Sequence, residues 1–203
     1  MNVAIIDYGA GNIRSVLSAL YSVGCHATVA QSPSDLRSAR AVILPGVGAA
    51  ADTMENLRAR GLADAVVEWV EADRPFMGIC MGLQVLFTES EEGGGQDCLG
   101  VLPGRVTRLP KGLKVPHMGW NQVHYTFESP LFQGIPDGSN FYFVHSFVAQ
   151  PDDSTVVLAE TEYGVRFCSA VQKGNLVATQ FHPEKSGALG LQVYRNFLES
   201  ALN

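Results

Sequence analysis

Residues 75–87 read Pro75-Phe76-Met77-Gly78-Ile79-Cys80-Met81-Gly82-Leu83-Gln84-Val85-Leu86-Phe87, with the pattern Gly-x-Cys-x-Gly between two apolar runs. The pattern predicts a strand, a sharp turn and a helix, with cysteine where hydrolases of the Gly-x-Ser-x-Gly type carry serine. A nucleophile at such a turn projects clear of the sheet, and the strained backbone costs about 1–3 kcal/mol. Side chains at Gly78 and Gly82 would collide there, so glycine is required at both positions.

The turn also affects the chemistry of the cysteine, because the first backbone N–H groups of the next helix have no intrahelical partners. Pointing toward Cys80, they can stabilise a thiolate and a developing oxyanion. The alternative is a buried cysteine between two unrelated glycines, since free cysteine is often a small core residue. On the motif alone, a catalytic role is favoured over core packing.

The composition of the 203-residue chain is that of a globular protein, with 46% hydrophobic and 17% charged residues. This length suits one domain with a substantial core, which we expect to span residues 1–203. The formal net charge is −6. An acidic chain gives no indication of nucleic acid or an anionic membrane as a partner.

The sequence favours a reduced, cytoplasmic protein. No apolar run is long enough to span a bilayer, and the N-terminus lacks the basic segment of a signal peptide. The cysteines, at positions 25, 80, 98 and 168, are scattered and form no Cys-x-x-Cys pair. That spacing argues against a disulfide scaffold and against a zinc site.

Strand and helix patterns alternate through the first half of the chain. Strands are predicted at 3–7, 26–30 and 41–44 and again before Cys80, the first and third of them buried, with amphipathic helices between them. Short strands with turns follow from residue 106, before a last helix near 191–198. We therefore predict an α/β fold: one domain with a mostly parallel central sheet flanked by helices, and additional antiparallel strands in the second half. The acidic, glycine-rich segment 89–96 is expected to be a solvated, mobile loop.

Two glycine-containing loops follow predicted strands. The first, Tyr8–Gly11, precedes a helix for which Asn12 is a suitable N-cap. A dinucleotide-binding fingerprint would need glycine where Arg14 stands, so that interpretation is rejected. An anion-binding or partner-contact role for this helix start stays open, beside a plain tight turn. The second loop, Pro45-Gly46-Val47-Gly48, can supply an oxyanion donor at the carboxyl end of its strand or can be an ordinary turn.

His182 is the candidate base for Cys80, because a free thiol is only a few per cent thiolate at pH 7. It directly follows an apolar strand, and Glu184 lies two residues on. That carboxylate could accept from the second imidazole nitrogen, fix the tautomer and stabilise the imidazolium. A strand-terminating turn with a salt bridge explains the same sequence equally well, since triads are recognised by geometry and not by sequence position.

Taken together, the motifs Gly-Ile-Cys-Met-Gly-Leu-Gln, Pro-Gly-Val-Gly and Gln-Phe-His-Pro-Glu-Lys-Ser resemble those of the class I (triad) glutamine amidotransferases. The resemblance covers the whole chain. Four further stretches are similar to one branch of that family, whose glutaminases work with a TIM-barrel cyclase subunit in histidine biosynthesis: Asp7–Asn12, Pro116–Asn121, Tyr142–Ser146 and His182–Gly187. Of these, Pro-His-Met-Gly-Trp-Asn is the most specific to the branch.

The resemblance implies a role for each matching residue. Cys80 attacks the side-chain amide of L-glutamine to give a thioester and ammonia, His182 moves protons, and Glu184 orients His182. The implied oxyanion hole comprises Met81, Gly46, Val47 and Gly48. The implied glutamine-binding residues are Gln84, Glu92, Ser146 and Phe147, and the implied partner interface contains Asn12, Trp120, Asn121, Tyr142 and Lys185. No cofactor and no metal are implied.

The implied partner takes the ammonia through its barrel to a phosphoribosyl substrate, forming imidazole glycerol phosphate and an aminoimidazole carboxamide ribotide. This chain would then be a hydrolase of a carboxamide C–N bond, and the heterodimer a lyase. Two alternatives remain. One is the glutaminase of another class I system, such as anthranilate or pyridoxal phosphate synthase. The other is a regulatory module without activity, since fold does not fix function.

Overall fold

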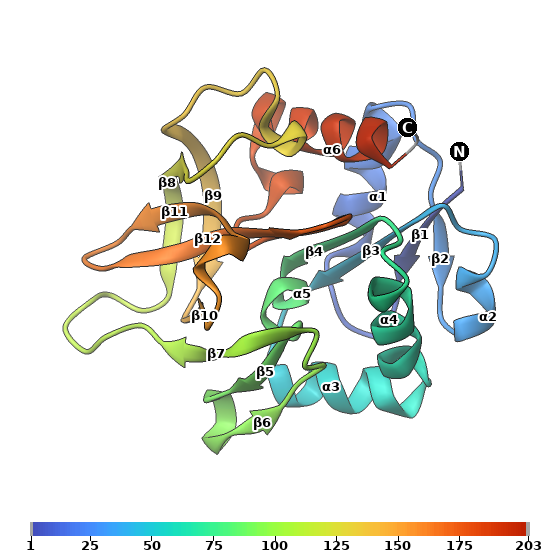
Figure 1. The fold of residues 1–203 in the computed structure, drawn as a ribbon, viewed down its shortest axis with the longest axis horizontal. Helices are drawn as coiled ribbons and strands as arrows, with labels where there is room; N and C mark the ends of the chain where they lie inside the picture. The colour runs from blue at the N-terminus through green and yellow to red at the C-terminus, as the bar shows by residue number, and fades with distance from the viewer. Residues whose placement is uncertain (1, 202–203) are drawn as a thin grey trace.

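The computed structural model describes residues 2–201, and its strands form one mixed sheet (Figure 1). In chain order the strands are β1 (Val3–Ile6), β2 (Thr28–Ala30), β3 (Ala41–Gly46), β4 (Phe76–Cys80), β5 (Phe87–Ser90), β6 (Gln96–Asp97), β7 (Leu102–Arg108), β8 (His117–Tyr125), β9 (Ser139–His145), β10 (Phe147–Pro151), β11 (Val157–Glu162), β12 (Arg166–Lys173) and β13 (Leu176–Thr179). The helices are α1 (Ile13–Ser22), α2 (Pro33–Leu36), α3 (Ala50–Ala59), α4 (Leu62–Glu71), α5 (Met81–Gln84) and α6 (Gly187–Ser200). Within residues 2–201, no helix combines the length and the apolar character needed to cross a membrane.

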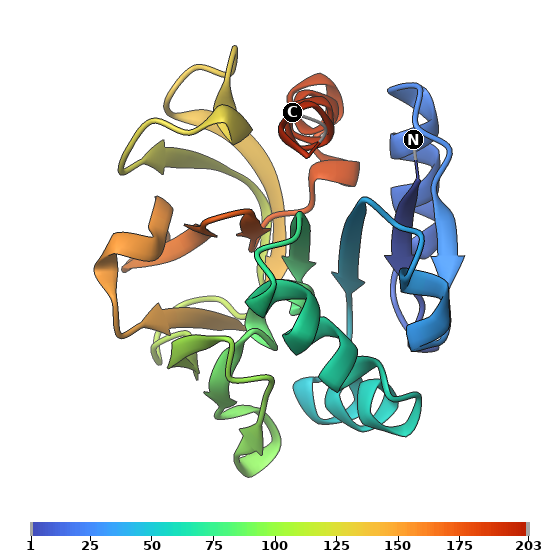
Figure 2. The ribbon, with the colours of Figure 1, turned by 45° about the vertical axis from the view of Figure 1, so that its right-hand side comes forward.

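The sheet confirms the predicted α/β class. Strands β2, β1, β3, β4 and β13 lie side by side and run parallel. Beyond β13 the order is β12, β10, β7, β5 and β6, and only the pairing of β5 with β7 is parallel there. Strands β11, β8 and β9 branch from β12. Figure 2 separates the N-terminal parallel strands, in blue, from the later strands, in yellow and orange.

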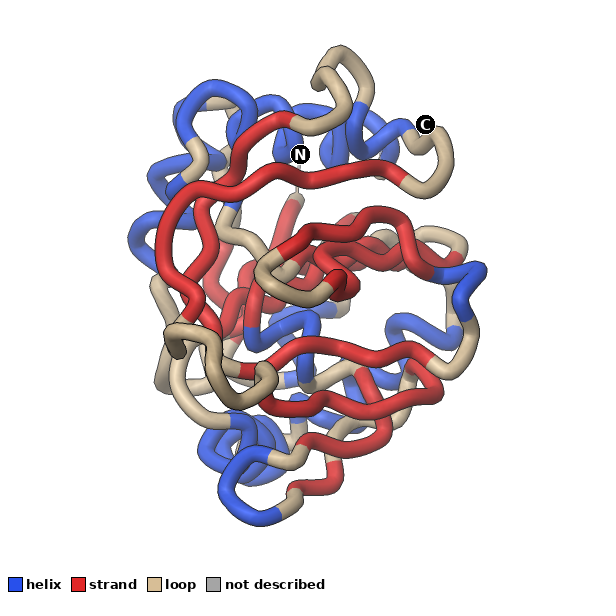
Figure 3. Tube along the Cα trace, turned by 90° about the vertical axis from the view of Figure 1, so that its left-hand side faces the viewer, coloured by secondary structure: helices blue, strands red, loops and turns tan. Residues whose placement is uncertain are grey.

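Helices cover both faces of the parallel strands (Figure 1). On one face α1 and α6 bury Val16, Leu20 and Phe197, and on the other α3 and α4 bury Leu57 and Val66. Every residue of β1, β3 and β4 is buried, as expected for parallel strands enclosed on both sides. The second half has less helical cover, and in the view of Figure 3 mainly strands and loops face the viewer.

Two local expectations are corrected. The apolar run after Cys80 forms only one helical turn, α5, before β5 begins. The segment 89–96, expected to be a mobile loop, is a paired hairpin in which Ser90 lies opposite Gln96. The helix ends early because the chain continues into β5, which pairs with β7, and the hairpin forms because β5 also pairs with β6.

Candidate active site

Cys80 occupies the sharp turn that the sequence predicts. It ends β4 and immediately precedes α5, with φ +55° and ψ −105°. A non-glycine residue rarely adopts a positive φ, and such strain persists only where the surrounding structure imposes it. Cys80 is 6% exposed and lines a cavity. The strand, the turn and the helix therefore present the sulfur as an elbow nucleophile requires.

The flanking glycines are imposed by the close approach of α5 to β3 and β4. A Cβ atom on Gly82 would collide with the carbonyl oxygen of Leu44. A Cβ on Gly78 would lie 2.6 Å from the Gly82 oxygen, and one on Gly46 would lie 2.5 Å from the Met81 Cβ. The glycines on both sides of Cys80 are therefore required by packing, as the sequence predicts for Gly78 and Gly82.

The register between β4 and β13 brings His182 to the cysteine. Thr179 pairs with Ile79 in parallel, so the residues that follow β13 emerge beside Cys80. His182 Nδ1 lies 2.8 Å from Glu184 Oε1, and both side chains are 1% exposed. The buried Nε2 atom of His182 has no hydrogen-bond partner within residues 2–201. The carboxylate thus fixes one imidazole nitrogen and leaves the other available for chemistry.

His182 is charged at neutral pH in this environment. Burial alone would lower its pKa, but the interactions with Cys80 and Glu184 outweigh burial and raise the pKa from 6.5 to about 9. Since Nε2 forms no hydrogen bond in this geometry, we attribute the effect of Cys80 to the charge of its thiolate. The arrangement therefore favours the imidazolium form of His182.

A cavity of about 330 Å³ contains the Cys80 and His182 side chains. It brings together most of the residues that the resemblance implied for the oxyanion hole and for glutamine. The expected residues that line it are Val47, Gly48, Met81, Gln84, Glu92, Ser146 and Phe147, and the other lining residues are Pro116, Val144 and His145. Gly46 does not line the cavity, but it pairs with Cys80 across β3 and β4.

Gln84 and Glu92 already have partners in the structure. Both N–H groups of the Gln84 amide are used, by the Phe147 carbonyl at 3.1 Å and by Gln180 Oε1 at 2.9 Å. Its Oε1 is buried with no partner among the described residues, so this oxygen is the atom left for a ligand. Glu92 Oε2 accepts from the Ala50 N–H at 2.6 Å, which ties the carboxylate to the first turn of α3.

Two buried histidines form a hydrogen-bonded pair at the cavity wall, where His145 lines the cavity and His117 does not. His145 Nδ1 lies 2.9 Å from the Phe147 oxygen, and His145 Nε2 lies 2.8 Å from His117 Nδ1. Because a carbonyl can only accept, His145 carries its proton on Nδ1, and His117 Nδ1 must then donate to His145 Nε2. Burial lowers the pKa of His145 to about 3 and that of His117 to about 4, so both rings are neutral.

The residues expected at a partner interface do not form one uniform surface. Trp120 is 58% exposed and packs edge-on against Tyr142, while Lys185 lies over the Tyr142 ring. Asn121 is only partly exposed, and its side chain contacts His117 and the Glu162 carbonyl. Asn12 precedes α1, but its side chain accepts from the Ser15 hydroxyl and not from a backbone N–H.

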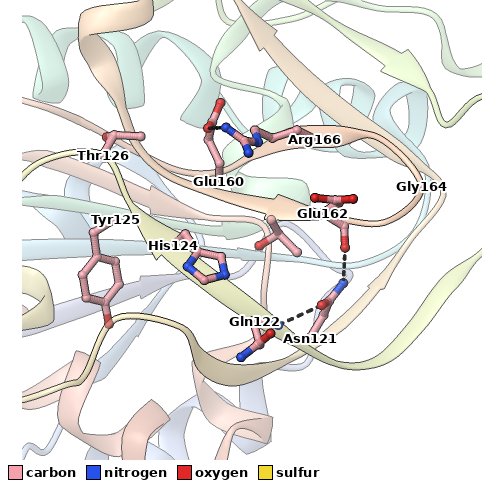
Figure 4. Close-up of a pocket in the computed structure, with 10 residues that line it drawn as sticks. Asn121, Gln122, His124, Tyr125, Thr126, Glu160, Glu162, Gly164 and Arg166 are labelled. Carbon is pink, nitrogen blue, oxygen red and sulfur yellow. Dashed lines mark hydrogen bonds and ion pairs between the residues drawn. The ribbon is translucent and has the colours of Figure 1, made fainter.

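A larger cavity of about 670 Å³ lies elsewhere, between β8 and the β11–β12 hairpin (Figure 4). It is lined by Asn121, Gln122, His124, Tyr125, Thr126, Glu160, Thr161, Glu162, Gly164 and Arg166. None of these is a cysteine, and the Arg166–Glu160 ion pair at its rim is exposed. The smaller cavity, in contrast, brings together the Cys80 thiol and the His182 imidazole, which is paired with the buried Glu184 carboxylate.

The sequence is similar to known amidotransferases along its whole length. Residues 4–201 match the family model described as glutamine amidotransferase class-I. The chain is 54% identical over 200 residues to the imidazole glycerol phosphate synthase subunit HisH of Dehalococcoides mccartyi (strain CBDB1), with 98% of each chain covered. It is 53% identical over 197 residues to the HisH subunit of Moorella thermoacetica, with 97% of this chain and 94% of that one covered. A crystal structure of a glutamine amidotransferase is 26% identical with a TM-score of 0.76, and 98% of each chain is covered.

Proposed function

Since this chain belongs to the class I glutamine amidotransferases, we propose that it is the glutaminase subunit of an imidazole glycerol phosphate synthase. It hydrolyses L-glutamine to glutamate and ammonia, and the ammonia passes to a TIM-barrel cyclase subunit in the cytoplasm. The high identity to two HisH subunits over nearly the whole chain supports this assignment. The chain acts as one domain, with the triad Cys80, His182 and Glu184 as its catalytic centre.

The reaction begins with attack of the Cys80 thiolate on the side-chain amide carbon of glutamine. The C–S bond forms, and the carbonyl oxygen becomes an oxyanion. His182 Nε2 then gives its proton to the amide nitrogen, the C–N bond breaks, and ammonia leaves behind a thioester. Water, deprotonated by the now neutral His182, hydrolyses the thioester and releases glutamate. Glu184 holds Nδ1 throughout and stabilises each imidazolium.

The oxyanion is held by backbone N–H groups at two neighbouring positions. One is Met81, whose N–H belongs to the first turn of α5 and therefore has no intrahelical acceptor. The other is the loop after β3, where Val47 and Gly48 line the same cavity as Cys80. Donors in a site that excludes water typically contribute about 3–4 kcal/mol each to transition-state stabilisation.

The single observation that carries this proposal is the state of His182. Its Nδ1 is fixed by a buried carboxylate at 2.8 Å, and its Nε2 is buried, without a partner among residues 2–201, beside the cavity that contains the Cys80 sulfur. A strand-terminating turn with a surface salt bridge would leave the pair exposed, whereas both side chains are 1% exposed. Glutamate formation from glutamine, compared with the Cys80→Ser variant, tests the assignment.

The partner surface proposed here is the cluster Met118, Trp120, Tyr142 and Lys185 beside the cavity. Met118 and Trp120 are 63% and 58% exposed, which is high for large apolar side chains. Trp120 and Tyr142 are directly opposed across β8 and β9. Tyr142 is linked to the catalytic histidine through its carbonyl, which accepts from the His182 N–H at 2.9 Å. A cyclase that docks on this cluster would therefore sit next to the released ammonia.

We expect Trp120→Ala to weaken binding of the cyclase subunit about 30-fold, since truncating a central aromatic residue typically costs about 2 kcal/mol or more. Titration calorimetry with the cyclase subunit from the same genome measures this. Tyr21→Ala is the matched control, because Tyr21 is 68% exposed but lies on α1, and it should leave the affinity unchanged. If Trp120→Ala weakened the affinity for the cyclase no more than Tyr21→Ala does, the partner would dock elsewhere on the surface.

A further inference from the structure

Gln180 makes the closest side-chain hydrogen bond to the nucleophile, and the resemblance implied no role for it although it begins the Gln-Phe-His-Pro-Glu-Lys-Ser motif. It follows β13, is fully buried, and emerges beside Cys80 because Thr179 pairs with Ile79. Its Nε2 atom lies 3.6 Å from Cys80 Sγ, within range of a hydrogen bond to sulfur. Its backbone N–H is fixed at 2.8 Å on the Ser169 carbonyl, so the residue is anchored at both ends.

The orientation of the Gln180 amide is fixed by a chain of donors that starts at a backbone carbonyl. The Phe147 oxygen can only accept, so the Gln84 amide must present its NH₂ group there. The same NH₂ group donates to Gln180 at 2.9 Å, which requires the Gln180 oxygen on that side. The Gln180 NH₂ group therefore points at sulfur, and the reversed amide would place two NH₂ groups against each other.

We propose that Gln180 is a catalytic residue of this glutaminase, whose amide N–H stabilises the Cys80 thiolate, and that Gln84 is the positioning residue that keeps this donor turned toward sulfur. The proposal rests on Cys80 being the nucleophile of the proposed function. A neutral donor serves both halves of the reaction. It stabilises the attacking thiolate, and when water cleaves the thioester it stabilises the thiolate that leaves carbon.

The donor complements His182 because it has no proton to lose. His182 gives up its proton when ammonia leaves and takes one from water when the thioester is cleaved, whereas the Gln180 amide donates in the same way throughout the reaction. The other titratable groups near Cys80 are the neutral His145, Glu92 at the cavity wall, Glu184 behind His182, and the buried Tyr8 hydroxyl. In the neutral form, the thiol itself faces the Val144 carbonyl at 4.0 Å.

The same series of hydrogen bonds explains how Gln84 can also bind the substrate. Its NH₂ group is committed to Phe147 and Gln180, and within residues 2–201 only its Oε1 is left without a partner. An acceptor at this place suits an N–H group of the bound glutamine. Replacing Gln84 should therefore lower kcat, because the Gln180 amide loses its orientation, and raise KM, because the bound glutamine loses its contact with Oε1. Replacing Gln180 should lower kcat alone.

The test measures the rate of iodoacetamide alkylation of Cys80 in the full chain as a function of pH, with the Cys80 peptide quantified by mass spectrometry. The alkylation midpoint is the pH at which this rate is half of its maximum. Gln180→Met keeps the shape and removes the donor, and Gln180→Glu places a carboxylate against sulfur. A hydrogen bond to a charged group of this kind changes an ionisation equilibrium about tenfold. We expect the alkylation midpoint of Gln180→Met to rise by about one pH unit, that of Gln180→Glu to rise further, and kcat of the complex to fall at least tenfold with KM unchanged.

Gln172→Met is the matched control, because Gln172 lies on β12 and its amide oxygen accepts from Ser129, away from the cavity. It should keep the wild-type midpoint. A rise in the midpoint supports the role of Gln180 even if the chain served a different partner, since alkylation needs neither glutamine nor a cyclase. An unchanged midpoint in both Gln180 variants, with circular dichroism showing folded protein, would overturn the proposal and leave Gln180 a packing residue.

Discussion

Replacing Cys80 by serine should abolish glutamine hydrolysis without unfolding the protein. Serine fits the elbow, where a larger side chain would not, but it cannot supply a thiolate at neutral pH. We expect a loss of at least a thousandfold in kcat, or about 4 kcal/mol in the barrier. Steady-state glutamate formation by the complex with the cyclase measures this, and thermal unfolding checks the fold. A loss within tenfold would be too small for the nucleophile.

His182→Ala should cause a comparable loss, and the double variant should lose little more than either single variant. The two groups act as a unit, because the imidazole is useful only when the sulfur attacks. The buried contact between His182 and Glu184 at 2.8 Å makes a separate prediction for Glu184→Gln: its loss of kcat should be smaller than that of either Cys80→Ser or His182→Ala, since the glutamine oxygen can still accept from Nδ1–H. Losses that simply add would show that His182 is not the partner of Cys80.

Activation by the partner should depend on Gly48. We expect the isolated chain to be nearly inactive, with its loop donor turned away from the oxyanion, and the liganded complex to gain about a hundred- to a thousandfold, mostly in kcat. Gly48 has φ +97°, and a Cβ there would meet nothing within 4 Å. Gly48→Val therefore tests the backbone conformation and not crowding, and it should reduce the activation at least tenfold.

Gly112→Val is a control matched in geometry. Gly112 also has φ +97°, and a Cβ on it would likewise meet nothing within 4 Å, but it lies between β7 and β8, outside the cavity. It should leave both activation and cyclase affinity unchanged, while Gly48→Val should change the affinity far less than the activation. An isolated chain that hydrolyses glutamine as fast as the liganded complex would show that the loop is only a turn.

The sequence predicts those parts of the site whose causes are local. The elbow is recognisable because a strained turn between a strand and a helix requires glycine on both sides of Cys80. The spacing of His182 and Glu184 is also local, since two residues beyond a strand suffice to bring the imidazole and the carboxylate together. The alternation of strands and helices likewise predicts the parallel half of the sheet.

The parts that the sequence does not reveal depend on pairing between distant strands. Gln180 reaches Cys80 because β13 inserts next to β4, and its place at the start of the Gln-Phe-His-Pro-Glu-Lys-Ser motif does not show that its amide faces the sulfur. The sequence predicts a mobile loop around Glu92, yet its carboxylate is fixed to Ala50, which is 42 residues away along the chain. The His117–His145 pair likewise joins residues of two different strands, so neither periodicity nor spacing marks it.

The transfer of ammonia from Cys80 to the cyclase is the central claim, and isotope labelling tests it most directly. The complex with the cyclase is supplied with glutamine labelled with ¹⁵N in the side-chain amide, in an excess of unlabelled ammonium and with the phosphoribosyl substrate. We predict that the imidazole product carries ¹⁵N from glutamine in the wild type. With Cys80→Ser, only unlabelled nitrogen should enter. A wild-type product that carries unlabelled nitrogen from the bulk ammonium would contradict the account.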